Sequence, residues 1–106
     1  ISQFRELQKA AEIEVSLEAC YRLGMHYLSK DQTKEAENAF LPTMANGGDN
    51  YYRLSSLAQL AALYENQGNS QKAINTYELL AASTNEERWA AAAKERIDIL
   101  KLQVNQ

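Results

Sequence analysis

Apolar and polar residues alternate along most of this chain with the period of an α-helix. Between residues 16 and 28 the apolar positions fall three or four residues apart, and they do so again between residues 51 and 65. This spacing places them on one face of a helix, whereas a strand would repeat every second residue. The pattern predicts helices over about residues 16–28, 33–41, 51–65, 70–82 and 84–102.

The first fifteen residues are also helical in composition, with Phe4, Leu7, Ala11 and Val15 on one stripe. Neither glycine nor proline separates them from the next predicted helix, so a continuous helix and a separate leading helix both fit. We expect a short break near residues 10–13. In that arrangement Phe4 and Leu7 can fold back as the end of a preceding repeat.

The polar segments between the helices carry helix-start signals. A Ser, Thr, Asp or Asn side chain before a helix can accept from its free N–H groups. We therefore expect caps from Thr33, from Asp49 or Asn50, from Ser70, and from Thr84 in a capping box with Glu87.

Glycine and proline mark where helices should end. Gly68 can adopt the left-handed conformation that closes a helix, and residues 46–50 contain two glycines in a turn. Pro42 lies within the second helical pattern, where it cannot donate to a preceding carbonyl. We expect that helix to bend or end near Leu41.

Residues 23–40 and residues 60–77 match without a gap at a separation of 37 residues. A fixed internal period of this length is typical of repeat architectures. Each unit predicts two helices joined by a turn, with a ring on the first facing an alanine on the second. The facing residues are Tyr27 over Ala36 and Tyr64 over Ala73.

Large residues of the two units should fill the space between successive helix pairs. These are Leu23, Phe40, Leu60 and Tyr77. The last helix should pack Trp89 on the second unit and cover Leu60, Tyr64 and Tyr77. Two repeats are close to the minimum that buries a continuous core, so we expect the flanking helices to be required for folding.

The composition and net charge of the chain favour some classes of protein and argue against others. The 106 residues are 45% hydrophobic, rich in helix formers and carry a formal charge of −3. They predict a single all-α domain. We expect no nucleic-acid partner, because no basic run is present, and no membrane insertion, because no apolar run reaches about 18 residues. Starting at Ile1 in a helical pattern, the sequence suggests a fragment of a longer chain.

The residues shared by the two units form a recognisable motif. They are Leu23-Gly24, Tyr27, Ala36 and Phe40, then Leu60-Ala61, Tyr64, Gly68, Ala73 and Tyr77. In this spacing they resemble two tetratricopeptide repeats. The chain departs from the usual pattern at Cys20 and Leu57, which replace a tryptophan, at Asp31, which replaces a glycine, and in its 37-residue period.

The resemblance implies an α-solenoid of antiparallel helix pairs, a right-handed superhelix of five or six helices. It divides residues 1–106 into a leading helix or repeat end at 1–16, repeats at 17–50 and 54–87, and a capping helix at 88–106. Longer repeats of this kind are similar to those of bacterial cell-envelope proteins. A cytoplasmic and a cell-envelope or periplasmic location both stay open.

The resemblance also implies a non-catalytic scaffold that binds a peptide or partner helix in a concave groove. The groove positions on the first helices are Glu18, Tyr21, Arg22, Met25, Leu28, Ser29, Ser55, Ala58, Gln59, Ala62, Glu65 and Asn66. The family's clamp for a C-terminal carboxylate needs asparagines where Met25 and Gln59 stand, so we do not expect a receptor for chaperone tails.

Tyr21, Met25 and Leu28 should form an apolar ridge opposite the small residues Ala58 and Ala62. One interpretation is that a hydrophobic partner helix docks in this slot. Another is that the chain's own N-terminal segment covers it, and an uncovered ridge could also form a homodimer. The alternative function is therefore a structural spacer or oligomerisation segment with the groove filled by self-contacts.

Little in the sequence suggests an enzyme. His26 and Cys20 are six residues apart on one predicted helix, about 240° around its axis, so they cannot pair within it. We expect His26 at or near the surface and Cys20 in the core. No catalytic, cofactor-binding or metal site is expected, and residues 46–50 lack the Lys-Ser/Thr of a phosphate loop.

Overall fold

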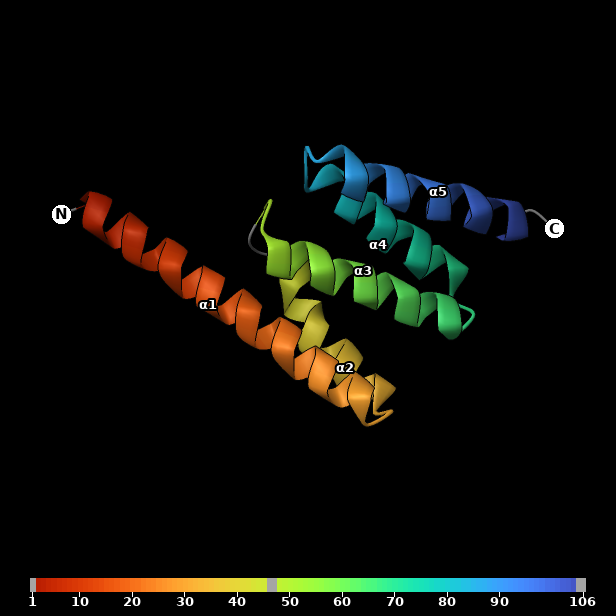
Figure 1. Ribbon diagram of the computed structural model, residues 1–106, viewed down its shortest axis with the longest axis horizontal. Helices are drawn as coiled ribbons and strands as arrows, with labels where there is room; N and C mark the ends of the chain where they lie inside the picture. Colours follow the sequence, from red (N-terminus) through yellow and green to blue (C-terminus); the bar gives the residue numbers. More distant parts are fainter. Residues whose placement is uncertain (1, 46–47, 105–106) are drawn as a thin grey trace.

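The computed structural model describes the backbone of residues 2–45 and 48–104, and the side chains of residues 16–45 and 48–103. Within these ranges the chain is helical and contains no strand. The elements are α1 (Ser2–Ser29), α2 (Thr33–Phe40), the 3₁₀ helix η1 (Leu41–Met44), α3 (Tyr51–Asn66), α4 (Ser70–Ala82) and α5 (Glu87–Val104). Successive helices lie side by side as a solenoid of helix pairs, which confirms the predicted fold class (Figure 1).

α1 is one continuous helix of 28 residues, so the predicted break near residues 10–13 is wrong. The segment consists of good helix formers without glycine or proline, and nothing in it stops propagation. Residue 4 lies about 25 Å along the axis from Tyr21, at 1.5 Å per residue. The N-terminal segment therefore cannot fold back over the Tyr21 ridge. The side chains of Phe4 and Leu7 lie outside the described residues.

Asparagine side chains cap α3 and α4. Asn50 Oδ1 accepts from the backbone N–H of Tyr52 at 2.8 Å, which confirms one of the two predicted caps there. Asn69, not Ser70, caps α4, accepting from the N–H of Lys72 at 3.3 Å. The cap prediction for Ser70 is wrong because the chain becomes helical one residue earlier than expected, so the serine hydroxyl lies inside the first turn.

The two threonine caps are also wrong. Thr33 is the first residue of α2, and the side chain of the preceding Gln32 does not cap it. Thr84 accepts from the N–H of Glu86 at 3.0 Å, two residues ahead, while α5 begins at Glu87. The threonine hydroxyl therefore stabilises the turn before α5, and the predicted capping box with Glu87 does not form.

The predicted helix stops at Gly68 and Pro42 are confirmed. Gly68 has a φ of +77°, in the left-handed region that glycine adopts most readily, and Gly48 has a φ of +53° in the turn before α3, of which residues 46–47 lie outside the described residues. Asp31 takes the same conformation, with φ +59°, at the turn where the family usually has glycine. α2 ends at Phe40, and Pro42 stands in the 3₁₀ turn that follows.

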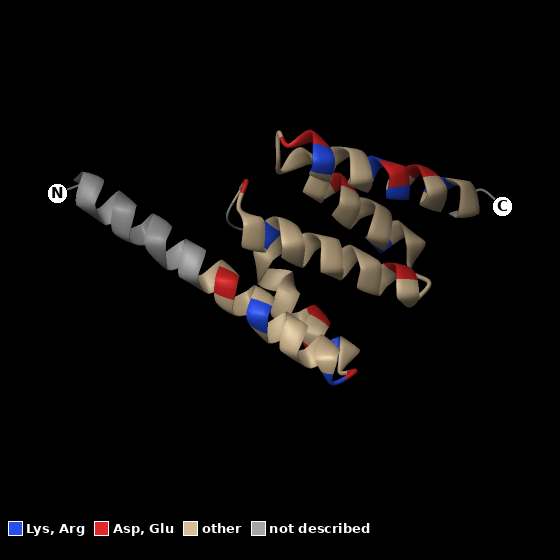
Figure 2. Cartoon of the chain, viewed as in Figure 1, with Lys and Arg blue, Asp and Glu red and all other residues tan. Residues whose placement is uncertain are grey.

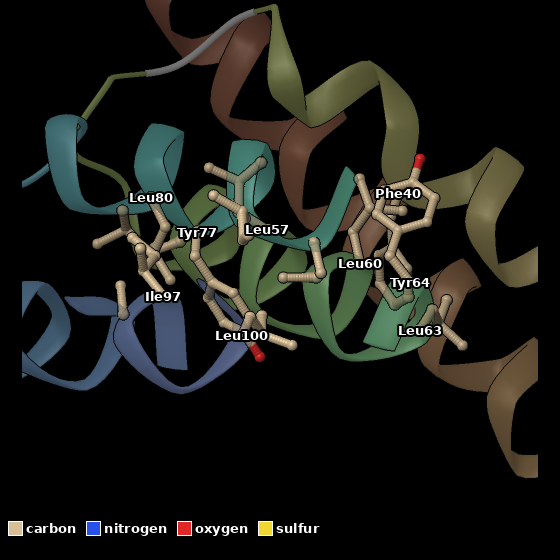
Figure 3. Close-up of a cluster of buried hydrophobic side chains, with 14 of the residues drawn as sticks. Phe40, Leu57, Leu60, Leu63, Tyr64, Tyr77, Leu80, Ile97 and Leu100 are labelled. Atoms are coloured by element: carbon tan, nitrogen blue, oxygen red, sulfur yellow. The ribbon is translucent and has the colours of Figure 1, made fainter. Parts of the chain in front are cut away.

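The core follows the line of the repeat. Phe40, Leu57 and Leu60 are fully buried, and Figure 3 shows Phe40 beside Leu60 and Tyr64. The ring of Phe40 also lies against Gly24, where a Cβ atom would come within 2.3 Å of it. Glycine is therefore required at position 24 because this ring occupies the space of a side chain.

Leu23 is 47% exposed, whereas its counterpart Leu60 is fully buried. The expectation that Leu23 fills the space between helix pairs is therefore wrong. α2 of the first unit covers Leu60, as the position of Phe40 in Figure 3 shows. No described helix lies in the same place against Leu23.

α5 packs along α4 and closes the other end of the stack (Figure 1). Its Ala93, Ile97 and Leu100 are buried in the same cluster as Tyr77 and Leu80. Trp89 packs against this cluster, as predicted. α5 does not cover all the residues that we expected, because α2 rather than α5 lies over Leu60 and Tyr64 (Figure 3).

Arg53 organises the connection between the two units. It is 6% exposed, and its guanidinium donates to the carbonyls of Thr43 at 2.7 Å, Met44 at 2.9 Å and Gly48 at 3.2 Å. It also donates to the hydroxyl of Ser83, at the end of α4. Burial lowers the pKa of Arg53 below its usual value. The carbonyls of η1 form the negative end of a helix turn, which suits a cation.

We predict that Arg53→Met lowers the free energy of unfolding by about 2–4 kcal/mol, because it leaves one buried and three partly buried acceptors without this donor. Arg53→Lys keeps the charge but cannot reach all four acceptors, so it should fall between wild type and Arg53→Met. Urea unfolding followed by circular dichroism gives the three values. Equal midpoints for all three proteins would show that this network contributes nothing to stability.

Candidate functional site

The predicted groove positions on α3 form one continuous line. Ser55, Ala58, Ala62 and Glu65 recur at steps of three and four residues. Ser55 is buried, and the two alanines are half-buried with only a methyl group each. This side of α3 therefore carries small side chains, and another backbone could approach it closely. We call the line of these four residues the floor.

α1 packs beside α3 and supplies the predicted ridge of Tyr21, Met25 and Leu28. All three side chains are half-buried and pack against the core cluster. The ridge is therefore partly used in holding α1 on the second unit. Each of the three side chains therefore keeps only part of its surface exposed.

Three tyrosines cluster where α3 begins against α1. The ring centroid of Tyr21 lies 6.4 Å from that of Tyr51 and 5.9 Å from that of Tyr52, and the centroids of Tyr51 and Tyr52 are 5.5 Å apart. Tyr51 is 62% exposed. Tyr52 donates to Glu18 at 3.3 Å, and Glu18 pairs with Arg22 at 2.9 Å. Aromatic surface with a polar rim thus marks this end of the floor.

The sequence analysis did not name Tyr51 and Tyr52 as groove residues. Tyr51 stands four residues before Ser55, so helical spacing already placed it on the floor's face. Tyr52 points across to α1, which helical spacing within α3 could not reveal. Extending the line of Ser55, Ala58 and Ala62 by one helical turn toward the N-terminus would have identified Tyr51.

Glu65 ends the floor at the opposite side. Its carboxylate accepts from the hydroxyl of Tyr77 on α4 and from Arg96 on α5, and its side chain is 16% exposed. Desolvation alone would raise the pKa of Glu65, but the hydrogen bonds from Arg96 and Tyr77 outweigh it and hold that pKa below its usual value. This predicted groove residue therefore ties three helices together.

Because of Tyr77, the stability of the protein should depend on pH in the alkaline range. Burial and then the hydrogen bond to Glu65 raise the pKa of Tyr77 from 10.0 to about 12. Because the folded-state pKa is the higher one, this stability is fully present below pH 10 and is lost as the pH rises toward 12. The loss should reach roughly 2 kcal/mol, at 1.36 kcal/mol per pKa unit.

A Tyr77→Phe variant should lack this part of the alkaline decline. Urea unfolding at intervals between pH 9 and pH 12 gives the difference from wild type, and Tyr51→Phe on the exposed ring is the matched control. Parallel curves for wild type and Tyr77→Phe would contradict the prediction.

The remaining predicted residues lie at or near the surface. Gln59 is half-buried, and Arg22, Ser29 and Asn66 are exposed. His26 is exposed, as predicted, but Cys20 is half-buried and lies outside the core cluster, so its assignment to the core is wrong. In the described ranges no three His, Cys, Asp or Glu side chains gather as metal ligands, and no helix is long and apolar enough to cross a membrane.

Comparison with known proteins agrees with the helix pairs. Models described as tetratricopeptide repeat match residues 17–41 and residues 56–92. No curated protein and no solved structure matches the chain. Such repeats generally serve as protein–protein interaction modules and are typically non-catalytic scaffolds. The chain belongs to the tetratricopeptide repeat family.

Proposed function

We propose that the groove between α1 and α3 binds a peptide or partner helix and that the chain performs no catalysis. The observation that carries this proposal is the Tyr21, Tyr51 and Tyr52 cluster at the end of a floor of small residues. Tyrosine is enriched at the centres of protein interfaces because its rigid ring buries a large area and its hydroxyl can still find a partner.

The floor and the cluster have complementary roles. Ala58 and Ala62 let a ligand backbone come close, and the exposed ring of Tyr51 offers apolar area at one end. The side chain of Arg22 is 69% exposed beside Glu18 and supplies a charged rim. Rim charges of this kind affect the rate and orientation of association more than affinity.

Selection of peptides from a random displayed library against the wild-type chain tests the proposal. Ligands of the groove should lose at least about tenfold in affinity for Ala58→Arg, which fills the floor, and for Tyr51→Ala, which removes the exposed ring. Leu102→Asp, at an exposed position on α5, is the matched control and should bind as wild type does.

Selected peptides that bind Ala58→Arg and wild type equally would place the binding surface elsewhere. Sedimentation of the unliganded chain tests the alternative function, in which the groove is filled by self-contacts. A dimer that dissociates in Tyr51→Ala would favour an oligomerisation segment over a peptide receptor.

A further inference from the structure

Two connections of the chain meet at one edge of the stack. The first runs from η1 to α3 and joins the two units, and the second is the turn between α4 and α5 (Figure 1). Two side-chain hydrogen bonds tie them together. Arg53 donates to the hydroxyl of Ser83, and Thr84 donates to Asp49 Oδ2 at 3.2 Å. The bonded residues are 30 and 35 positions apart in the chain, so these contacts exist only in the folded stack.

Arg53 contacts both connections at once. It is the third residue of α3 and the one basic residue of that helix, blue near the start of α3 in Figure 2. The first turn of a helix is the positive end of its dipole, so α3 itself does not favour a cation there. The acceptors that hold the guanidinium are the carbonyls of Thr43, Met44 and Gly48 and the hydroxyl of Ser83. The position of Arg53 therefore depends on the first connection and on the end of α4 together.

The hydroxyl of Ser83 is oriented to accept from Arg53. It donates its proton to the carbonyl of Leu79 at 2.6 Å, within α4, so its lone pairs are left for the guanidinium. A hydrogen bond from a charged donor is stronger than one between neutral groups. Loss of either partner therefore removes a strong contact from both connections.

The first turn of α3 carries the groove tyrosines as well as Arg53. Tyr51 and Tyr52 directly precede Arg53 in the chain. Asn50 Oδ1 accepts from the N–H of Tyr52 at 2.8 Å and from that of Arg53 at 3.2 Å. The first N–H groups of a helix have no partner within it, so this turn depends on its cap and on side-chain contacts. The contacts that hold Arg53 therefore also hold the backbone of the two tyrosines.

We propose that the two connections and the first turn of α3 open and close as one cooperative unit, with Arg53 as the residue that couples them. Proteins open locally in such units at a lower free energy than that of global unfolding. A change at the α4–α5 turn is then transmitted to the groove end of α3. The coupling needs no ligand. Only its consequence, that the unit positions the Tyr51 ring for a bound peptide, rests on the proposed function.

Amide hydrogen exchange of the unliganded chain, followed by NMR, tests the coupling in both directions. Ser83→Ala removes the acceptor on α4, and the amides of Tyr52 and Arg53 should then exchange about five- to tenfold faster. Asn50→Ala removes the cap of α3. It should speed exchange of the amides of Ser83 and Glu86, which donate within and beside the α4–α5 turn, at least about threefold.

Ser29→Ala is the matched control for Ser83→Ala. The hydroxyl of Ser29 also donates to a carbonyl of its own helix, at 2.6 Å, but it lies at the exposed end of α1. This variant should leave the exchange of the Tyr52 amide within about twofold of wild type. The amide of Leu60, in the buried middle of α3, reports global unfolding. In an Arg53→Met background Ser83→Ala should have no further effect on the Tyr52 amide, because the bond is already absent.

An unchanged Tyr52 amide in Ser83→Ala would overturn the proposal. Equal acceleration of the Tyr52 and Leu60 amides would also overturn it, since the substitution would then lower only global stability. A full effect of Ser83→Ala in the Arg53→Met background would show that Arg53 does not couple the connections. Arg53→Lys replaces Arg53→Met if the latter does not fold, and it should reduce the effect of Ser83→Ala. Coupled exchange in a chain that selects no peptide would contradict the proposed function alone.

Discussion

Replacing Phe40 with alanine should lower the free energy of unfolding by about 3–5 kcal/mol. Phe40 is fully buried and lies between Gly24 of α1 and the Leu60 and Tyr64 side chains of α3. Its removal leaves a cavity where two helix pairs meet. For a domain of this size the melting temperature should fall by about 15–30 °C, which differential scanning calorimetry can measure.

Leu41→Ala is the control for this substitution, because Leu41 follows Phe40 in the chain and its side chain is 37% exposed. It should cost clearly less than Phe40→Ala, since about a third of the leucine already contacts water. Similar losses in the two variants would contradict the central place of Phe40 and would indicate that the region tolerates collapse.

A chain that ends at residue 86 should lose its cooperative unfolding transition. Without α5 the chain loses the buried Ala93, Ile97 and Leu100 and exposes Tyr77 and Leu80. Each large side chain contributes about 1.5–3 kcal/mol when buried, so the total loss approaches the 5–15 kcal/mol stability of a whole domain. Thermal melting followed by circular dichroism should show a broad decline.

Two point variants test the same packing without deleting a helix. Leu100→Asp places a charge at a side chain that is 2% exposed, and Leu102→Asp does so at one that is 68% exposed. The first should unfold at a much lower urea concentration than wild type and the second near it. A truncated chain that melts at the wild-type temperature would contradict the role of α5 as a cap.

The period of 37 residues was sufficient to predict the helix pairs. Large and small residues alternate at fixed positions, and Gly24 and Ala61 leave room for the helices to approach. Helical periodicity, the Asn50 cap, and the stops at Pro42 and Gly68 depend on neighbours within a few residues of the chain. Interactions of this range can be recognised without knowledge of the fold.

The residues that cap each helix could not be predicted with the same accuracy. Ser70 and Thr33 have suitable side chains, but the preceding turn makes the chain helical one residue before the expected point. Whether a hydroxyl caps a helix or lies inside its first turn depends on the φ and ψ angles of a single residue at the start of the helix. Several residues nearby, including Asn69, have comparable preference for the position.

The candidate groove residues were predicted from helical spacing, which relates positions within one helix. Ser55, Ala58 and Ala62 recur along one face of α3 in this way, but Glu65 is bound to residues of α4 and α5. A carboxylate that helical spacing assigns to the groove can instead form hydrogen bonds between helices once the helices pack together. Its partners are 12 and 31 residues away in the chain.

The sequence by itself determined that this protein is an all-α chain of paired helices with a repeating contact pattern, because hydrophobic period and turn residues act locally. Tertiary structure decided which of two equivalent leucines is buried, since α2 of the first unit covers Leu60 and no described helix of a preceding unit covers Leu23. It also decided that Tyr51 and Tyr52 meet Tyr21 and that Arg53 joins the two units. These outcomes depend on which surfaces meet, and equivalent positions in a repeat acquire different roles when their neighbours differ.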